Sequence, residues 1–241
     1  ANGNFITINH DTNGRLNSVT DTLGRVINVN YDVQGSLTSI TQARSTGTFT
    51  FATFTYANQT ISPNFSGSNL VGIANGASVK VLQKITYSDS SFTQFEYNAF
   101  GQVWWIKNHA PDGHQLNYTA LNFAAEGQAQ TDCPRLALIR NWAENFNLNT
   151  SGQPQEVSTY INYYETYPFT LPNGTQSSGT LAQIVAPNGV HSNNFFGNSG
   201  WNEGLPIQTD DYTFDNNAWN RRRWNWTNYT QDNPALNYIL N

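Results

Sequence analysis

Polar and apolar residues alternate along much of the chain, and glycine-containing turns interrupt the alternation at regular intervals. In VINVNY (26–31) the odd-numbered residues are all apolar and the even-numbered ones are mostly polar. A period of two is typical of β-strands. Glycine turns at positions 14, 24 and 35 are spaced by about ten residues. The pattern therefore predicts a meander of antiparallel β-hairpins.

One short pattern recurs three times, as HDTNGRLNSVT from His10, YDVQGSLTSIT from Tyr31 and YNAFGQVWWIK from Tyr97. Glycine permits positive φ at a bend, and an aspartate can accept hydrogen bonds from the N–H groups of its turn. We expect the tyrosine to bury its ring against the next hairpin and to keep its hydroxyl in water. Since a lone hairpin is barely stable, stacked neighbours would stabilise each repeat. The structural residues of the repeat are predicted to be Tyr31, Asp32, Gly14, Gly35, Tyr97 and Gly101.

Three other turns share one chemistry, a proline followed by Asp or Asn and then Gly. They are APDG (110–113), LPNG (171–174) and APNG (186–189). Proline presets φ at the first corner, and glycine takes the left-handed conformation that rejoins the strands. All three are predicted to be hairpin loops.

One segment has a helical pattern instead. In TDCPRLALIRNWAENFN, Asp132 is a candidate N-cap and Pro134 stands in the first turn, where proline is tolerated. An apolar stripe at helical spacing follows, formed by Leu136, Ile139, Ala143 and Phe146. We predict one helix over about 134–147, lying against the sheet.

The predicted fold class is therefore all-β, with stacked hairpins in an antiparallel sheet and one short helix. The repeat is least regular at 42–80 and 120–155. We expect a single segment over 1–241, because no linker rich in Pro, Ser and Gly separates two halves.

The composition and charge of the chain disfavour or exclude several kinds of function and site. The net charge of -5 disfavours a nucleic-acid binder, and no apolar run is long enough to cross a membrane. A single cysteine, Cys133, excludes an internal disulfide and a thiolate metal cluster. A buried structural role for this thiol and a reactive one at a helix start both stay open. Because the chain starts with Ala and contains no Met, we expect it to be part of a longer protein.

The recurring pattern resembles the YD repeats of RHS-type proteins, a family that includes bacterial polymorphic toxin shells and the teneurins. The resemblance implies a long sheet of hairpins that spirals into a hollow shell or tube, in an extracellular or exported setting. Tyr31, Asp32 and Gly35 match the tyrosine, aspartate and glycine of the family pattern. The sequence departs from it where His10 replaces Tyr and Asn98 replaces Asp, and 42–80 holds no clean repeat.

Several residues could bind a metal or catalyse a reaction, but simpler structural interpretations of them exist. His109 and His114 flank one turn, with Asp112 between them; these are metal-ligand types, but polar loop residues are the simpler interpretation. Several carboxylates offer pairs for glycoside hydrolysis, although their spacing singles out none: Glu165, Glu203, Asp210, Asp211 and Asp215. We expect no metal and no cofactor.

Aromatic side chains are the candidate binding groups. WNRRRWNW (219–226) is read as a strand with Trp on one face and Arg stems covering it; base or sugar stacking is the alternative. Adjacent strand residues point to opposite faces, so one of Trp104 and Trp105 should lie in the core and the other in the open or against a neighbour. The exposed one would be the best candidate for stacking on a sugar.

Three functions follow from these features. The leading hypothesis is a scaffolding segment of an exported YD-repeat protein, part of a shell, tube or fibre without catalysis of its own. Its partners would be neighbouring repeats or further copies of the chain. The alternative is an extracellular glycan-binding module that uses Trp104 or Trp105. The third is a glycoside hydrolase.

Overall fold

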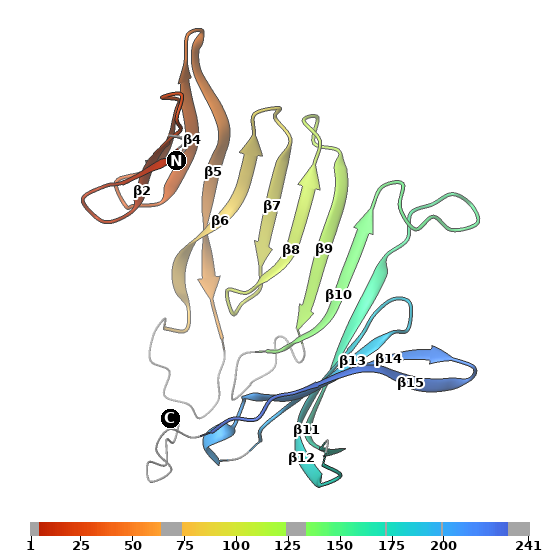
Figure 1. Ribbon diagram of the computed structural model, residues 1–241. Coiled ribbons are helices and arrows are strands. Elements are labelled where there is room, and N and C mark those ends of the chain that lie inside the picture. Colours follow the sequence, from red (N-terminus) through yellow and green to blue (C-terminus); the bar gives the residue numbers. More distant parts are fainter. Residues whose placement is uncertain (1–4, 64–73, 124–133, 172, 199, 231–241) are drawn as a thin grey trace. The chain divides into compact units, whose positions relative to one another are not determined.

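The computed structural model describes residues 5–63, 74–123, 134–171, 173–198 and 200–230 (Figure 1). Within these residues fifteen strands follow one another in chain order in one antiparallel sheet. The strands are β1 (Thr7–His10), β2 (Leu16–Thr20), β3 (Val26–Tyr31), β4 (Leu37–Arg44), β5 (Gly47–Ile61), β6 (Ala77–Tyr87), β7 (Phe92–Tyr97), β8 (Val103–His109), β9 (Gln115–Phe123), β10 (Leu136–Ala143), β11 (Val157–Thr170), β12 (Gln176–Val185), β13 (His191–Phe196), β14 (Pro206–Asp215) and β15 (Ala218–Trp226).

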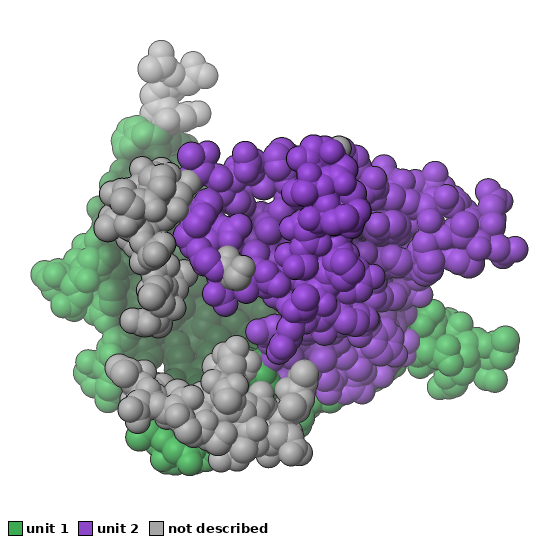
Figure 2. All heavy atoms as spheres, turned by 90° about the horizontal axis from the view of Figure 1, so that it is seen from below, with its two compact units in different colours: residues 1–120, 125–134, 141–155 green, residues 121–124, 135–140, 156–241 purple. Residues whose placement is uncertain are grey.

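The all-β prediction is confirmed, and the only helical element of the described residues is a 3-10 turn at Gly200–Asn202. Contacts gather in two compact units, which Figure 2 colours separately. Unit 1 comprises 1–120, 125–134 and 141–155, and unit 2 comprises 121–124, 135–140 and 156–241. The expectation of one undivided segment stays a prediction.

The predicted helix over 134–147 is wrong, because Leu136–Ala143 forms strand β10. Neighbouring strand β9 offers partners that outweigh the helical pattern. The Thr119 hydroxyl donates to the Asn141 side-chain oxygen over 2.8 Å, and the Glu144 N–H donates to the Leu116 carbonyl over 2.9 Å. Helix propensity is a weak prior that such pairing overrides.

The repeat turns share one backbone geometry. In the turn of Asp32, its N–H donates to the Ser36 carbonyl and the Gly35 N–H donates back to the Asp32 carbonyl, each over 2.9 Å. Gly35 has φ of 86°, the left-handed conformation that glycine adopts without strain. The same pair of hydrogen bonds closes the predicted loops that begin at Ala110, Leu171 and Ala186. These three predictions are confirmed.

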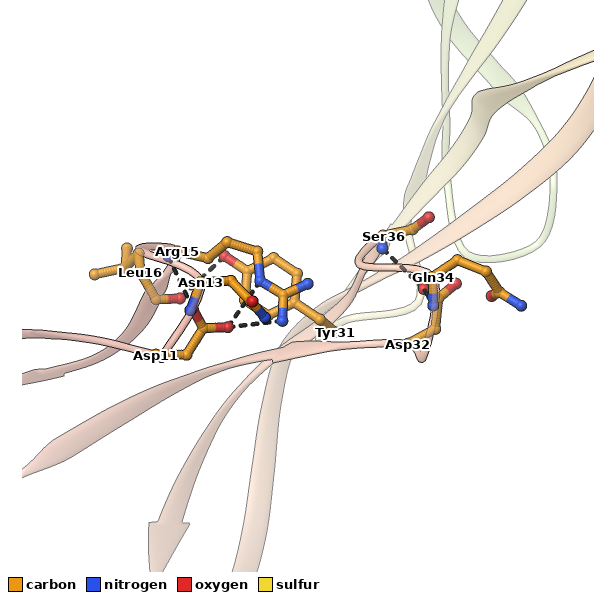
Figure 3. A network of polar contacts seen from close by, with 8 residues as sticks. All are labelled: Asp11, Asn13, Arg15, Leu16, Tyr31, Asp32, Gln34 and Ser36. Carbon is orange, nitrogen blue, oxygen red and sulfur yellow. Dashed lines mark hydrogen bonds and ion pairs between the residues drawn. The ribbon is translucent and has the colours of Figure 1, made fainter.

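A side-chain oxygen completes each repeat turn. Asp32 Oδ1 accepts the N–H groups of Gln34 and Ser36 over 3.0 and 2.8 Å, as Figure 3 shows. Asn98 accepts two N–H groups in the same way, each over 3.0 Å. Asn149 does so over 2.9 Å in a turn that the sequence pattern had not indicated. An amide oxygen thus serves as well as a carboxylate, so the departure at Asn98 leaves the turn intact.

Each repeat also contains a β-bulge at a fixed place. In the second repeat Tyr31 pairs with Leu37 while Asn30 pairs with Ser39, so Thr38 is an extra residue. The first and third repeats shift register at the same step, and there the extra residues are Asn17 and Trp104. A bulge breaks the strict alternation of side chains along a strand. Sequence alternation is therefore unreliable just after the aliphatic residue of each repeat.

Few large side chains are fully buried. In unit 2, Phe169, Leu181 and Phe195 form a small cluster on strands β11, β12 and β13. The rings of Phe169 and Phe195 stack with centroids 4.7 Å apart. With so small a core, contacts between neighbouring strands carry a large share of the stability.

Gly24 tests the left-handed turn position, because it has φ of 76° and a Cβ added there would meet only open space. Any loss of stability on substitution then comes from backbone strain alone. Gly24→Ala should lower the free energy of unfolding by about 1–2 kcal/mol, and Gly24→Asn by less, since Asn tolerates this conformation. Urea denaturation of the three proteins checks the order. Equal stability of wild type and Gly24→Ala would contradict the assignment.

Candidate functional site

Tyrosine hydroxyls join successive hairpins in unit 1. The Tyr31 hydroxyl donates to the Leu16 carbonyl over 3.0 Å. The same contact links Tyr56 to Leu37 over 3.0 Å, and Tyr97 to Leu82 over 2.7 Å. The three contacts connect the hairpins β1–β2, β3–β4, β5–β6 and β7–β8 in order. Tyr31 and Tyr97, whose hydroxyls we expected to lie in water, each donate that hydroxyl to a main-chain carbonyl of the preceding hairpin.

A cation completes the contact in the first repeat. The Arg15 guanidinium lies 4.5 Å from the centroid of the Tyr31 ring and 2.7 Å from Asp11 Oδ2 (Figure 3). The carboxylate that organises the turn thus holds the cation over the ring of the next hairpin. We call this carboxylate, cation and tyrosine arrangement the clamp.

The second repeat builds the same clamp from distant residues. Ser36 stands where the first repeat has Arg15, and Lys80 of β6 supplies the missing charge. Lys80 Nζ lies 2.6 Å from Asp32 Oδ2 and 5.0 Å from the Tyr56 ring centroid. Sequence reasoning missed Tyr56 and Lys80, since 42–80 shows no clean repeat. The sequence held one signal of this contact. Ser36 stands in place of the arginine of the first repeat, so Asp32 has no cation within its own turn.

These contacts shift the pKa values of their members. The Lys80 ammonium, followed by the Ser36 N–H, lowers the pKa of Asp32 below its ordinary value. The pKa of Asp11 is lowered in the same direction by the N–H and guanidinium of Arg15. Burial raises the pKa of the Tyr97 hydroxyl, which keeps it protonated as a donor.

The two candidate tryptophans lie against each other. Their ring centroids are 6.4 Å apart with the planes at 85°, and both side chains are half-buried. We expected one indole in the core and the other in the open or against a neighbour, whereas here both are half-buried and each is the other's neighbour. The cause is the bulge, which makes Trp104 the extra residue between Val103 and Trp105.

Trp105 begins an aromatic row across three strands. Its ring lies 4.9 Å from that of Tyr118 on β9, and Tyr118 stacks on Trp142 of β10 with centroids 5.6 Å apart. Lys107 Nζ is 4.8 Å from the Trp105 ring centroid and 2.6 Å from Glu96 Oε1. Cross-strand pairing places Glu96 and Trp105 on one face of the sheet.

A hollow of about 300 Å³ lies beside Trp104 on strands β5 to β8. Its lining combines rings, amides and one carboxylate: Ala57, Gln59, Val81, Gln83, Gln94, Phe95, Glu96, Tyr97 and Trp104. Within the described part of the chain, the amides of Gln83 and Gln94 and the indole N–H of Trp104 have no hydrogen-bond partner. The hollow thus offers free donors and acceptors next to an aromatic ring.

The histidines of the 110–113 turn are engaged separately. His109 Nδ1 lies 3.0 Å from the Gly113 carbonyl oxygen, and its ring stacks on Phe92 at 4.5 Å. His114 Nε2 lies 3.0 Å from Glu144 Oε2. No group of three or more His, Cys, Asp or Glu gathers into a metal-binding arrangement among the residues that the structure describes. Cys133 lies outside them.

In unit 2 the arginine run pairs with the aspartates of β14. Arg223 Nη2 lies 2.7 Å from Asp211 Oδ2, and Arg222 forms an ion pair with Asp215. The guanidinium of Arg221 approaches the buried Asp210 at 3.7 Å. The cross-strand register puts Trp219, Trp224 and Trp226 on one face of β15, which confirms the strand interpretation of this segment.

The remaining candidate carboxylates, Glu165 and Glu203, have separate surroundings. Glu203 lines a second hollow of about 290 Å³ together with Arg135 and Tyr163. The main-chain carbonyl of Glu165 accepts a hydrogen bond from the Thr180 hydroxyl over 3.4 Å.

Neither a protein-family model nor a curated protein matches the sequence. Solved structures that resemble the chain include "Crystal Structure of TcdB2-TccC3-TEV" and "Crystal Structure of TcdB2-TccC3 without hypervariable C-terminal region". The first is 16% identical with a TM-score of 0.45, and the likeness covers 90% of this chain and 10% of that one. The second is 15% identical with a TM-score of 0.43, over 89% and 10%. Both scores are below 0.5, so the likeness assigns neither a family nor a function.

The described residues contain no helix that is long and apolar enough to cross a membrane.

Removing one hydroxyl tests the contact between hairpins. Tyr31→Phe should lower the free energy of unfolding by about 1 kcal/mol, because the Leu16 carbonyl loses a donor while the ring stays in place. Tyr160→Phe is the matched control, since Tyr160 is 52% exposed and its hydroxyl has no partner among the described residues. Chemical denaturation should show no more than about 0.5 kcal/mol for this control. Equal losses in the two variants would refute the contact.

The Asp32 carboxylate gives a pH test. Its pKa is lower in the folded protein than in the unfolded one, so it stabilises the fold above about pH 4. That contribution disappears as the pH falls through the lowered pKa. Asp32→Asn keeps the turn acceptor, as Asn98 does, but loses the charge. Thermal unfolding between pH 6 and 2 should therefore depend less on pH in Asp32→Asn, and Lys80→Gln should change the slope in the same direction. An unchanged slope in both variants would contradict the clamp.

Proposed function

We propose that the chain is a scaffolding segment of an exported YD-repeat protein, with hairpins that build part of a larger shell, tube or fibre. The observation that carries the proposal is the clamp, because it satisfies the polar groups of one hairpin with side chains of another. Asp32, Lys80 and Tyr56 come from three different parts of the chain and hold neighbouring hairpins together. Such contacts between hairpins are expected of a protein whose role is to form an extended sheet.

The first and last strands of the sheet, β1 and β15, have features that support extension of the sheet by further strands. Ile8 on β1 is 58% exposed, and Trp224 on β15 is 44% exposed with Trp219 and Trp226 beside it on the same face. Large apolar side chains on terminal strands promote pairing with further strands unless something covers them. We propose that neighbouring hairpins of the same protein, or another copy of the chain, cover them. Export and a cell-surface setting belong to the same proposal and rest on the YD-like pattern.

Light scattering as a function of protein concentration tests this function. The chain should associate as its concentration rises, and lysine at a terminal strand should suppress association through charge repulsion and desolvation. The test variants are Ile8→Lys and Trp224→Lys. Val33→Lys is the matched control, since Val33 is 98% exposed in the Asp32 turn, which joins β3 to β4 and is not part of a terminal strand.

The proposal predicts less association for the two terminal-strand variants and wild-type behaviour for Val33→Lys. A folded, monodisperse monomer at every concentration would argue against it. Association that all three lysine substitutions weaken equally would also contradict it, because the effect would then follow net charge.

A further inference from the structure

We propose that the hollow beside Trp104 binds a neutral saccharide, with the indole stacking on the sugar ring and the glutamine amides bonding its hydroxyl groups. This site is independent of the scaffolding role, since a sheet can be a structural element and still present a ligand site on one face. The third repeat differs from the first two at Trp104, which lines this hollow, and at the adjacent Trp105.

The first two repeats place small polar residues where the third places its tryptophans. Trp104 occupies the bulge position of Asn17 and Thr38. Trp105 occupies the position of Ser18 and Ser39. The turn and the bulge form in all three repeats, so the fold does not need indoles at these positions. Their presence in one repeat alone calls for another role.

The polar contacts next to these two positions also differ between the second and the third repeat. In the second repeat the Asn30 amide donates to the hydroxyls of Ser39 and Thr41, each over 3.1 Å. In the third repeat Glu96 and Lys107 stand at the positions of Asn30 and Thr41 and form an ion pair of 2.6 Å. This pair removes the net charge from the rim of the hollow and holds a cation over Trp105 at 4.8 Å.

The remaining polar groups of the hollow match a sugar. Gln83 and Gln94 have amides without partners among the described residues, and each can both donate and accept. A pyranose has hydroxyl groups at its edge and an apolar C–H face, which packs on an aromatic ring. The indole of Trp104 has one ring neighbour in the described residues, Trp105, and its N–H is a further free donor. The volume of about 300 Å³ is at the small end of ligand pockets.

The same lining disfavours other ligand classes. A nucleic acid or a phosphate would need unpaired cations, but Lys107 is neutralised by Glu96 and the whole chain carries a net charge of -5. An apolar ligand would bury the free amides without replacing their bonds to water, which costs free energy. An extended peptide would add to a terminal strand, whereas this hollow lies on interior strands β5 to β8.

The test is a binding screen followed by three variants. The full chain is applied to an array of neutral oligosaccharides of glucose, galactose, mannose and N-acetylglucosamine. Each hit is then titrated in solution with tryptophan fluorescence as the readout. Trp104→Thr introduces the residue type found at position 38 and should fold normally, which circular dichroism checks. Gln94→Ala removes one amide, and Trp201→Thr is the matched control because it removes an exposed indole of unit 2 that lies outside the terminal strands.

The proposal predicts binding that is about tenfold or more weaker in Trp104→Thr, weaker in Gln94→Ala and unchanged in Trp201→Thr. Trp104→Phe should retain most of the affinity, since it keeps a stacking ring. An array without hits would overturn the proposal. So would hits whose affinity survives Trp104→Thr unchanged, or falls equally in Trp201→Thr.

Discussion

The hydrogen bond from a tyrosine hydroxyl to a carbonyl of the preceding hairpin is the contact on which the rest of unit 1 depends. It recurs from Tyr31, Tyr56 and Tyr97 and links four successive hairpins. In the first two contacts a cation lies over the ring and is held by an aspartate of the turn. Hairpins are marginal alone, and few side chains here are fully buried. Lateral contacts of this kind therefore explain how a thin sheet stays ordered.

A turn that tolerates substitution lets the repeats diverge without loss of the fold. Aspartate and asparagine both supply the side-chain oxygen of the loop, as Asp32 and Asn98 show. The second repeat replaces its arginine with Ser36 and recovers the charge from Lys80. The third repeat keeps the turn and the bulge while exchanging its surface residues. Divergence of this kind allows one face of a structural sheet to acquire a separate binding role.

The local features of this fold could be predicted from the sequence, whereas the features that depend on pairing across strands could not. The hairpin loops at 110–113, 171–174 and 186–189 follow from Pro, Asn or Asp and Gly, whose preferences act within four residues. Strand β10 was mistaken for a helix, because its apolar spacing fits both periods and only its neighbour decides between them. The bulge at Trp104 arises from cross-strand register and has no local signal in the sequence. The Ser36 that replaces an arginine indicates a missing cation, but it does not identify Lys80, which lies 48 residues from Asp32.

Hydrogen exchange monitored along the chain tests most directly the claim that tyrosine contacts couple neighbouring hairpins. In Tyr31→Phe, we expect faster exchange of backbone amides in both β2 and β3, while β12 and β13 of unit 2 keep their protection. Coupling of neighbours without a global effect is the behaviour expected of stacked repeats. Unchanged protection in β2, or a uniform increase in exchange along the whole chain, would contradict this coupling.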